Sequence, residues 1–258
     1  MNSRNDSIES SNNLTEAYPS RRQEPWRHYW KRWARFYVYV PERTTDICGV
    51  ESTKDEKWLD KLEPQGLVRG RPTAECMDGT REDIMAKIDE WCDDLDASNN
   101  ILWIRGFPGV GKSAVARKLA SKLKSSHRFG SSFFFQRELA TVQTPVSLWR
   151  TVASDLSREY PSARSAIVAK LKDNEIDLEN TDAEELFVSL VEEPLKQSSD
   201  IPQGRLPVVV IDAMDECGGL DGSRSKHRTI LLKGMRAWAR LGPRFKLVVT
   251  SRPEDDIS

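Results

Sequence analysis

The residues with the clearest chemical pattern stand between positions 106 and 113. Gly106, Gly111, Lys112 and Ser113 follow the G-x-x-x-x-G-K-S spacing of a phosphate-binding loop, or P-loop. Glycines let backbone N–H groups curl around phosphate oxygens, and a helix that begins at about Gly111 directs its unpaired N–H groups at the same anion. We therefore expect this stretch to bind the phosphates of a nucleotide, through Gly106, Pro108, Gly109, Val110, Gly111, Lys112, Ser113 and Ala114.

A lysine and a hydroxyl complete the phosphate chemistry expected at this loop. Lys112 is long enough to reach the β- and γ-phosphates, and the Ser113 hydroxyl is a ligand for Mg²⁺. The alternative is a glycine-rich turn that binds nothing. The apolar run Ile101–Ile104 just before the loop and the helical pattern just after it favour phosphate binding.

A second group of polar residues follows the apolar run at 206–211. A P-loop needs a metal-holding carboxylate at the tip of a neighbouring strand, and Asp212 stands at that point. Because Mg²⁺ keeps much of its hydration shell, we expect Asp212 to hold it through water. Asp215 or Glu216 then accepts a proton from the attacking water or orients it, with Glu216 favoured. The alternative is a solvated acidic turn without a chemical role.

A third group closes the last apolar run, at Thr250-Ser251-Arg252. The carboxyl ends of parallel strands lie at one edge of a sheet, so a hydroxyl and a guanidinium here would sense or stabilise the γ-phosphate. The alternative is a surface arginine beside Pro253. The predicted metal ligands are Ser113 and Asp212, and the predicted catalytic set is Lys112, Asp212, Asp215, Glu216 and Arg252.

Alternating strands and helices must position these residues. Apolar runs predict strands at 101–104, 132–135, 206–211 and 246–250. Helical periodicity predicts a short helix near 54–62 and longer ones from about Thr80 to Leu95, after Ser113, from Thr144 to about 156, over 162–172, from Thr181 to about 191 and over 226–241. The alternation indicates an α/β fold of three layers, in which a mostly parallel sheet has helices on both faces.

Four of these helices have apolar faces that we expect to be buried. Each face groups residues at helical spacing. They are Ile84, Ile88, Trp91 and Leu95 in the first; Val115, Ala116, Leu119, Ala120 and Leu123 in the helix after Ser113; Trp149, Val152, Ala153 and Leu156 in the third; and Leu186, Phe187, Leu190 and Val191 in the fourth.

The whole composition sets limits on function. The chain has 258 residues, enough for one or two domains, and 39 Lys and Arg against 40 Asp and Glu leave a net charge of −1. This balance disfavours a basic coat for nucleic acid. No apolar run approaches the roughly 18 residues of a membrane span, and the four cysteines form no C-x-x-C pair. We therefore expect a soluble, cytoplasmic protein without a zinc site.

The amino-terminal part differs from the rest. Residues 1–24 are polar and predict disorder, and residues 25–69 form an arm and linker before the core at 70–258. Within the arm, Trp26, Trp30 and Trp33 stand among basic residues. Such a stretch would lie on an anionic membrane, stack on single-stranded nucleic acid or bind a protein partner. We favour an aromatic face that docks on its own domain, since 36–40 also fits a strand.

Together these motifs resemble the NACHT-type (nephrocystin-type amino-terminal) P-loop domain of fungal STAND proteins, which are similar to NLR immune receptors. The resemblance covers about 70–258 and is carried by stretches at 76–81, 101–106, 133–137, 210–217 and 249–254. It implies a sheet of the additional-strand (ASCE) class, with the acidic strand between the P-loop strand and another. It also implies ATP, or less often GTP, with Mg²⁺, Arg252 as first sensor, and 79–81 near the base.

The resemblance implies a signalling switch that binds Mg-nucleotide, hydrolyses it slowly and changes conformation or self-associates. Members of that family continue into lid domains and repeats, whereas this sequence stops at Ser258, so we expect weak hydrolysis. Two other classes stay open. One is a P-loop kinase or motor, and the other is a fragment without turnover that acts through its arm.

Overall fold

The structure is a computed structural model that describes residues 55–64, 82–173, 176–178, 180–198, 201–202 and 206–253, without the side chains of 222–224. All of them belong to the unit Cys48–Ser258. The predictions for 1–24, for the aromatic arm at 25–40 and for the stretch at 76–81 lie outside these residues. None of the helices described has both the length and the hydropathy needed to span a bilayer.

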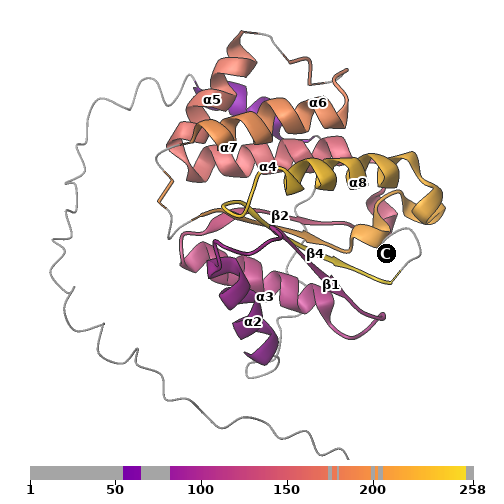
Figure 1. The fold of residues 1–258 in the computed structure, drawn as a ribbon. Coiled ribbons are helices and arrows are strands. Elements are labelled where there is room, and N and C mark those ends of the chain that lie inside the picture. The colour runs from indigo at the N-terminus through magenta and orange to yellow at the C-terminus, as the bar shows by residue number, and fades with distance from the viewer. Residues whose placement is uncertain are drawn as a thin grey trace, which may run out of the picture. The chain divides into compact units, whose positions relative to one another are not determined.

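Four parallel strands form the sheet at the centre of the fold (Figure 1). They are β1 (Ile101–Arg105), β2 (Phe129–Phe134), β3 (Val208–Asp212) and β4 (Lys246–Ser251), and they lie in the order β1-β4-β3-β2. Every residue of β3 and β4 is buried, as expected for strands covered on both faces. The predicted parallel α/β sheet is therefore confirmed.

The strand order corrects one expectation. The acidic strand β3 was expected beside the strand that enters the glycine loop, but β4 lies between β3 and β1. Burial accounts for the arrangement. The strand β4 is buried along its whole length and takes a central place, whereas the residues of β1 are only partly buried and β1 pairs with β4 on one side. As a result, the end of β4 lies between the ends of β1 and β3.

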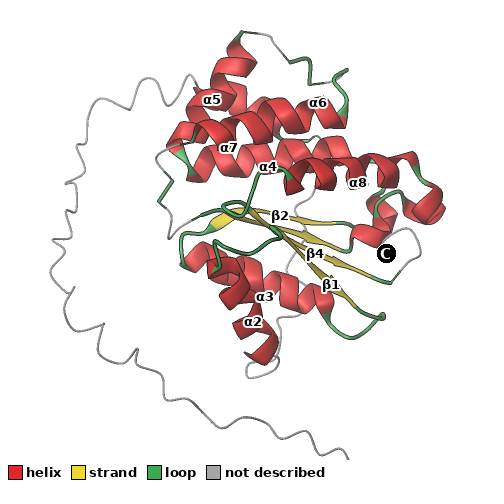
Figure 2. Cartoon of the chain, viewed as in Figure 1, coloured by secondary structure: helices red, strands yellow, loops and turns green. Residues whose placement is uncertain are grey.

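Helices cover both faces of the sheet (Figures 1 and 2). On one face lie α2 (Glu82–Asp93) and α3 (Lys112–Ser125), and on the other lie α4 (Pro145–Glu159) and α8 (Lys226–Ala239). Outside α4 and α8 there is a further group: α5 (Pro161–Lys172), α6 (Ala183–Phe187), the π-helical segment Val188–Glu192 and α7 (Glu193–Gln197). The three predicted layers are present, with this additional group stacked on one of them.

Most predicted helix faces are buried as expected. All five predicted residues of α3, all four of α4 and all four of the segment 183–192 are buried. Thr144 caps α4, and its side chain accepts a hydrogen bond from the backbone of Ser147. The cap of α6 is Asp182 rather than the predicted Thr181, because the Asp182 carboxylate accepts the free N–H groups of the first turn.

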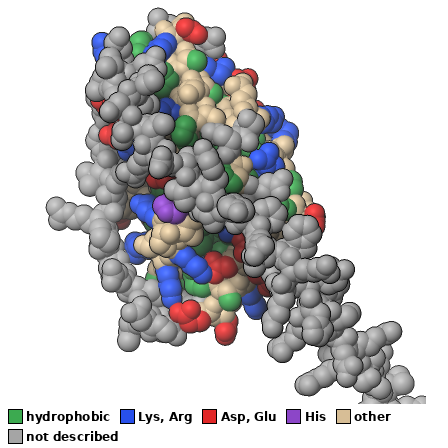
Figure 3. All heavy atoms as spheres, turned by 90° about the vertical axis from the view of Figure 1, so that its left-hand side faces the viewer, with side chains coloured by type: hydrophobic (Ala, Val, Ile, Leu, Met, Phe, Trp, Pro, Cys, Tyr) green, Lys and Arg blue, Asp and Glu red, His purple; other side chains and the backbone are tan. Residues whose placement is uncertain are grey.

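The predicted face of α2 was wrong by one residue. Ile84 and Leu95 are exposed, while Met85, Ile88 and Cys92 are buried against α3 and the sheet. The helix ends at Asp93, so Leu95 falls outside it. Ion pairs fix the helix on α3, among them Lys118 with Glu82 at 2.8 Å and Lys122 with Asp89. Figure 3 shows basic and acidic side chains interspersed over this part of the surface.

A short helix precedes α2 and the strands of the sheet in the sequence. It covers 55–59 and continues as the 3-10 turn η2 (Asp60–Leu62), as predicted for 54–62. Leu59 and Leu62 are fully buried in a cluster formed mainly by residues of α4, α5 and the 183–192 segment. Lys172 and Arg164 of α5 pair with Asp55 and Glu56 at 2.7 and 3.1 Å. This helix is an integral part of the packed fold.

Candidate functional site

The predicted site residues gather at one edge of the sheet, where the four parallel strands end. Arg105, the last residue of β1, pairs with Ser251, the last residue of β4. The Gly106 N–H donates a hydrogen bond to the carbonyl oxygen of Ser251 at 3.3 Å. On the other side of β4, Val249 pairs with Ile211, which places Asp212 level with Thr250. The glycine loop (residues 106–113) follows β1, Asp212 is the last residue of β3 and Arg252 follows β4, so all three lie at the ends of adjacent strands.

Two glycines of the glycine loop have backbone conformations that other residues rarely adopt. Gly109 has φ +81°, and Gly111, the N-cap of α3, has φ +84°. A third glycine is required by space, because a Cβ on Gly106 would come within 2.9 Å of the Val110 side chain. The predicted helix start at Gly111 is confirmed. The loop thus turns sharply into α3 and brings the free N–H groups of the first turn, which carries Ser113 and Ala114, to this edge.

Lys112 lies across the glycine loop. Its Nζ donates hydrogen bonds to the carbonyl oxygens of Gly106 at 2.6 Å and Phe107 at 3.2 Å. Both acceptors are main-chain atoms at the start of the same glycine loop, so the ammonium group lies over the loop. The side chains of Phe107 and Val110 are 72 % and 50 % exposed. This half of the site is consequently open to solvent.

Asp212 is buried at the end of β3, with 2 % of its surface exposed. Its Oδ1 accepts a hydrogen bond from the hydroxyl of Thr250. The same hydroxyl accepts the N–H of Ala213 at 2.9 Å, where the chain turns with φ +53°. A hydroxyl at the end of β4 was expected to face the γ-phosphate, but the Thr250 hydroxyl donates to Asp212 and the Ser251 hydroxyl accepts from the Trp103 indole at 2.9 Å. Both are oriented by protein groups.

Asp215 is as deeply buried as Asp212 and contacts Arg252. Asp215 lies in η6 (Met214–Glu216), and its Oδ1 accepts the backbone N–H of Arg252 at 2.9 Å. Its Oδ2 lies 3.2 Å from Nε of the same arginine. The carbonyl oxygen of Asp215 accepts a hydrogen bond at 2.9 Å from Arg228 of α8, which is fully buried. Both the side chain and the backbone of Asp215 are therefore fixed.

Glu216 is less buried and has two different neighbours. Its Oε2 accepts the backbone N–H of Arg137 at 3.1 Å, and its Oε1 lies 3.5 Å from an Nη of Arg252. Burial raises the pKa of Glu216 above its ordinary value, and the negative charge of Asp215 acts in the same direction. The Arg137 N–H and the charges of Arg252 and Arg137 oppose this increase in pKa. A carboxylate with a raised pKa at such an edge is suited to accept a proton.

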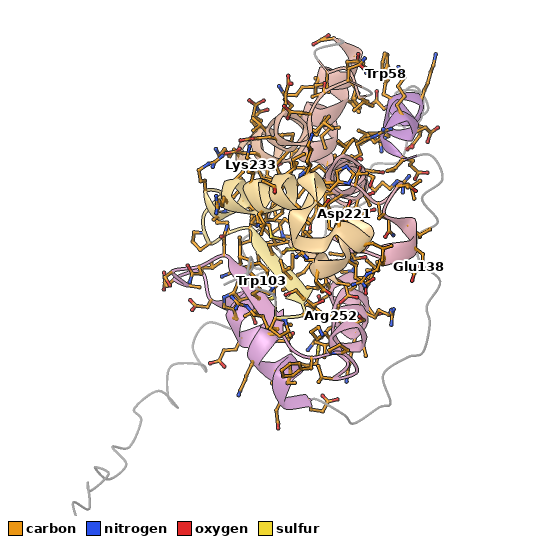
Figure 4. The ribbon with its side chains drawn as sticks, turned by 90° about the vertical axis from the view of Figure 1, so that its right-hand side faces the viewer. Trp58, Trp103, Glu138, Asp221, Lys233 and Arg252 are labelled. Atoms are coloured by element: carbon orange, nitrogen blue, oxygen red, sulfur yellow. The ribbon has the colours of Figure 1, made fainter. Side chains whose placement is uncertain are left out.

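Figure 4 views the edge on which these groups meet. Arg252 lies at the tip of β4, and the segments that carry Glu138 and Asp221 flank it. These segments are the 3-10 turns η3 (Arg137–Leu139) and η7 (Gly219–Arg224), which contact each other. The side chain of Arg252 is 38 % exposed. Its guanidinium therefore combines a buried anchor with an accessible end.

The residues proposed as metal ligands come from two elements at this edge. Ser113 lies in the first turn of α3, and α3 packs against β3 and β4. Over the residues that the structure describes, no group of three or more His, Cys, Asp or Glu side chains is arranged to hold a metal ion. A carboxylate, a hydroxyl and otherwise water or phosphate oxygens fit Mg²⁺, which prefers few protein ligands.

Three residues at the site have contacts that the sequence did not predict. Arg137 was part of a recognised stretch, Thr250 was expected to face a ligand, and Arg228 was not singled out. Arg137 contacts Glu216 through its backbone N–H, which nearly every residue type has, so the type of residue 137 could not predict the contact. Arg228 stands in the first turn of α8 between His227 and Thr229, and it is fully buried, which is rare for an arginine. Its polar neighbours in the sequence gave no signal of this burial.

Comparison with known families adds one finding. A family model described as "Nephrocystin 3, N-terminal" matches residues 79–252, about two thirds of the chain. The match extends from just before α2 to Arg252, so it contains the glycine loop and the carboxylates Asp212, Asp215 and Glu216. No curated protein matches the chain.

Proposed function

The chain belongs to the nephrocystin 3 N-terminal family, and on that premise we propose that it binds a nucleoside triphosphate with Mg²⁺ and hydrolyses it slowly, as a NACHT-type signalling switch. The observation that carries the proposal is the order of the strand ends. The glycine loop after β1 and Asp212 after β3 lie at one edge, and β4 between them delivers Arg252. This strand order differs from the one that the resemblance to the ASCE class implied, yet it still brings the three groups to one edge of the sheet.

Binding would use groups that already point to this edge. The backbone N–H groups of the glycine loop and the first turn of α3 surround the phosphates, and the dipole of α3 favours their charge. Lys112 exchanges the carbonyl oxygens of Gly106 and Phe107 for the β- and γ-phosphates. Ser113 and Asp212 hold Mg²⁺, which neutralises phosphate charge when bound.

Hydrolysis would proceed by in-line attack of water. The water oxygen forms a bond to the γ-phosphorus, the bond from that phosphorus to the β–γ bridging oxygen breaks, and the water proton passes to Glu216. Arg252 stabilises the charge on the transferred group. Slow turnover is expected because Glu216 already accepts the Arg137 N–H and lies beside Arg252, so it must leave these partners to meet the water.

A binding module without turnover is the second candidate. It is favoured by the same contacts of Glu216, if they persist when nucleotide is bound. Both candidates predict nucleotide binding, and they differ in phosphate release. In both candidates, the preference for ATP or GTP depends on the protein groups that contact the nucleotide base.

The first experiment identifies the nucleotide. Mass spectrometry of the purified full chain is expected to find bound ATP, ADP or their guanine counterparts, and calorimetry then compares Mg-ATP with Mg-GTP, with and without EDTA. Phosphate release measured with and without DNA or small acceptors separates the slow switch from a motor or a kinase. Absence of binding to either triphosphate would remove the proposed function.

A further inference from the structure

Two carboxylates next to each other in sequence have different surroundings. Asp215 is 2 % exposed, and both of its oxygens face Arg252. Glu216 is more exposed and faces Arg137 on one side and Arg252 on the other. A group that takes a proton from water needs an oxygen that water can reach. Of the two side chains, that of Glu216 is the more exposed, at 23 % against 2 %.

Arg252 is held by Asp215 at two points along its length. The backbone N–H donates to Oδ1 at 2.9 Å, and Nε lies 3.2 Å from Oδ2. The second contact is an ion pair without the geometry of a hydrogen bond, since Oδ2 has no hydrogen-bond partner. Together the contacts fix the start and the middle of the side chain, and they leave the two Nη groups to project beyond Asp215.

The rest of the surroundings makes this hold rigid. Asp215 is itself fixed through its carbonyl oxygen, which accepts from the buried Arg228. Pro253 follows Arg252 and restricts its backbone to extended conformations. The anchor therefore has few alternative positions, while the Arg252 side chain as a whole is 38 % exposed and one Nη lies 3.5 Å from Glu216.

We propose that Asp215 is a positioning residue: it holds Arg252 so that the Nη groups face the terminal phosphate of the bound nucleotide, and it takes no proton itself. The inference rests on the proposed function, because it assigns one step of that function to a particular pair. It makes Asp215 a determinant of the choice between triphosphate and diphosphate. An aimed guanidinium contacts the γ-phosphate, which only the triphosphate carries.

The test is a double-mutant cycle on the full chain. Calorimetry measures Mg-ADP and a nonhydrolysable imido analogue of ATP on wild type, Asp215→Asn, Arg252→Gln and the double variant. Asp215→Asn should reduce the preference for the triphosphate analogue about tenfold and leave ADP affinity within about twofold. In the Arg252→Gln background, Asp215→Asn should have no further effect on that preference or on phosphate release.

Two further variants complete the experiment, one as an alternative test and one as a control. Arg252→Lys keeps the charge but lacks Nε, so it should lose the preference as Asp215→Asn does, and it carries the test if Asp215→Asn does not fold in a thermal melt. Asp221→Asn changes an exposed carboxylate of the following turn, η7, and should behave as wild type.

The outcomes separate the two levels of the proposal. If Asp215→Asn slows phosphate release further in the Arg252→Gln background, Asp215 acts on the reaction itself and the positioning role is wrong. An unchanged triphosphate preference in Asp215→Asn and Arg252→Lys also overturns the role while nucleotide binding stands. If wild type binds neither nucleotide, the proposed function fails and the role of Asp215 fails with it.

Discussion

The two halves of the candidate site differ in how they are held. The glycine loop is exposed, and its lysine contacts only carbonyl oxygens of the loop itself. In the acidic cluster (Asp212, Asp215 and Glu216) the two aspartates are buried, and each of the three carboxylates accepts a hydrogen bond from another segment. The difference indicates that the first half is shaped by backbone conformation, whereas the second half is fixed by contacts between segments that are distant in the sequence.

The largest expected effect tests the open half. Lys112→Ala should weaken Mg-nucleotide binding on the order of a hundredfold. It removes the ammonium group that, in the proposed function, leaves the loop carbonyl oxygens and binds the β- and γ-phosphates. It should leave the melting temperature unchanged, since Lys112 contacts only its own loop. Calorimetry and a thermal melt check both parts. Lys122→Ala, also on α3, serves as the control, and equal affinity in Lys112→Ala and the control would remove the phosphate assignment.

The next effect tests the acidic half during the reaction. Glu216→Gln should retain nucleotide binding and slow phosphate release roughly 100-fold, the usual contribution of a general base. The amide keeps the size of the side chain and can still accept the Arg137 N–H. Glu138→Gln, an exposed change on the neighbouring turn, is the matched control in single-turnover assays. An unaltered rate in Glu216→Gln would transfer the proton to another group.

A smaller effect concerns stability. Thr250→Val keeps the shape of a fully buried residue but removes the hydroxyl that donates to Asp212 and accepts from Ala213. The buried carboxylate and N–H then lack partners, so the free energy of unfolding should fall by about 1–3 kcal/mol. Urea denaturation measures it. The exposed Thr229→Val on α8 should change little, and a similar loss in both variants would contradict an acidic half fixed by these contacts.

The smallest expected effect is a shift in pH dependence. Glu216 must be ionised to accept a proton, and burial raises its pKa, so hydrolysis should increase with pH through a value above the ordinary glutamate pKa. Arg252 lowers this pKa, so Arg252→Gln should move the acidic limb of the pH–rate profile to higher pH. Asp215 and Arg137, the other charges near Glu216, are unchanged in this variant. A limb that stays in place would indicate that another group controls the rate.

Local sequence patterns predicted most of the elements and their buried faces. The helix after Ser113 and the cap at Thr144 could be predicted because short-range periodicity and capping determine them. The face of α2 could not, because Ile84 and Met85 both fit an apolar stripe and only packing on α3 selects between them. The place of β4 between β1 and β3 is likewise set by long-range packing, which no local run encodes.

The candidate site shows the same limit in more detail. The spacing of residues 106–113 predicted the turn and the helix start, since glycine conformation is a local property. The partners of the acidic residues depend on contacts between segments that are distant in sequence, such as Thr250 with Asp212 and Arg137 with Glu216. The sequence could name the carboxylates, but it could not say that Asp215 is buried against Arg252 while Glu216 is the more exposed of the two.

The short helix at 55–62 has a practical consequence for anyone who isolates this family segment. The family match begins at residue 79, yet Leu59 and Leu62 are fully buried beside α4 and α5, and each such burial contributes roughly 1.5–3 kcal/mol. A protein that begins at residue 79 would lack Leu59 and Leu62, so the apolar residues of α5 that pack against them would become exposed. It would also lose the ion pairs of Arg164 with Glu56 and of Lys172 with Asp55. Recombinant versions that start upstream of Asp55 should stay in solution where shorter ones precipitate.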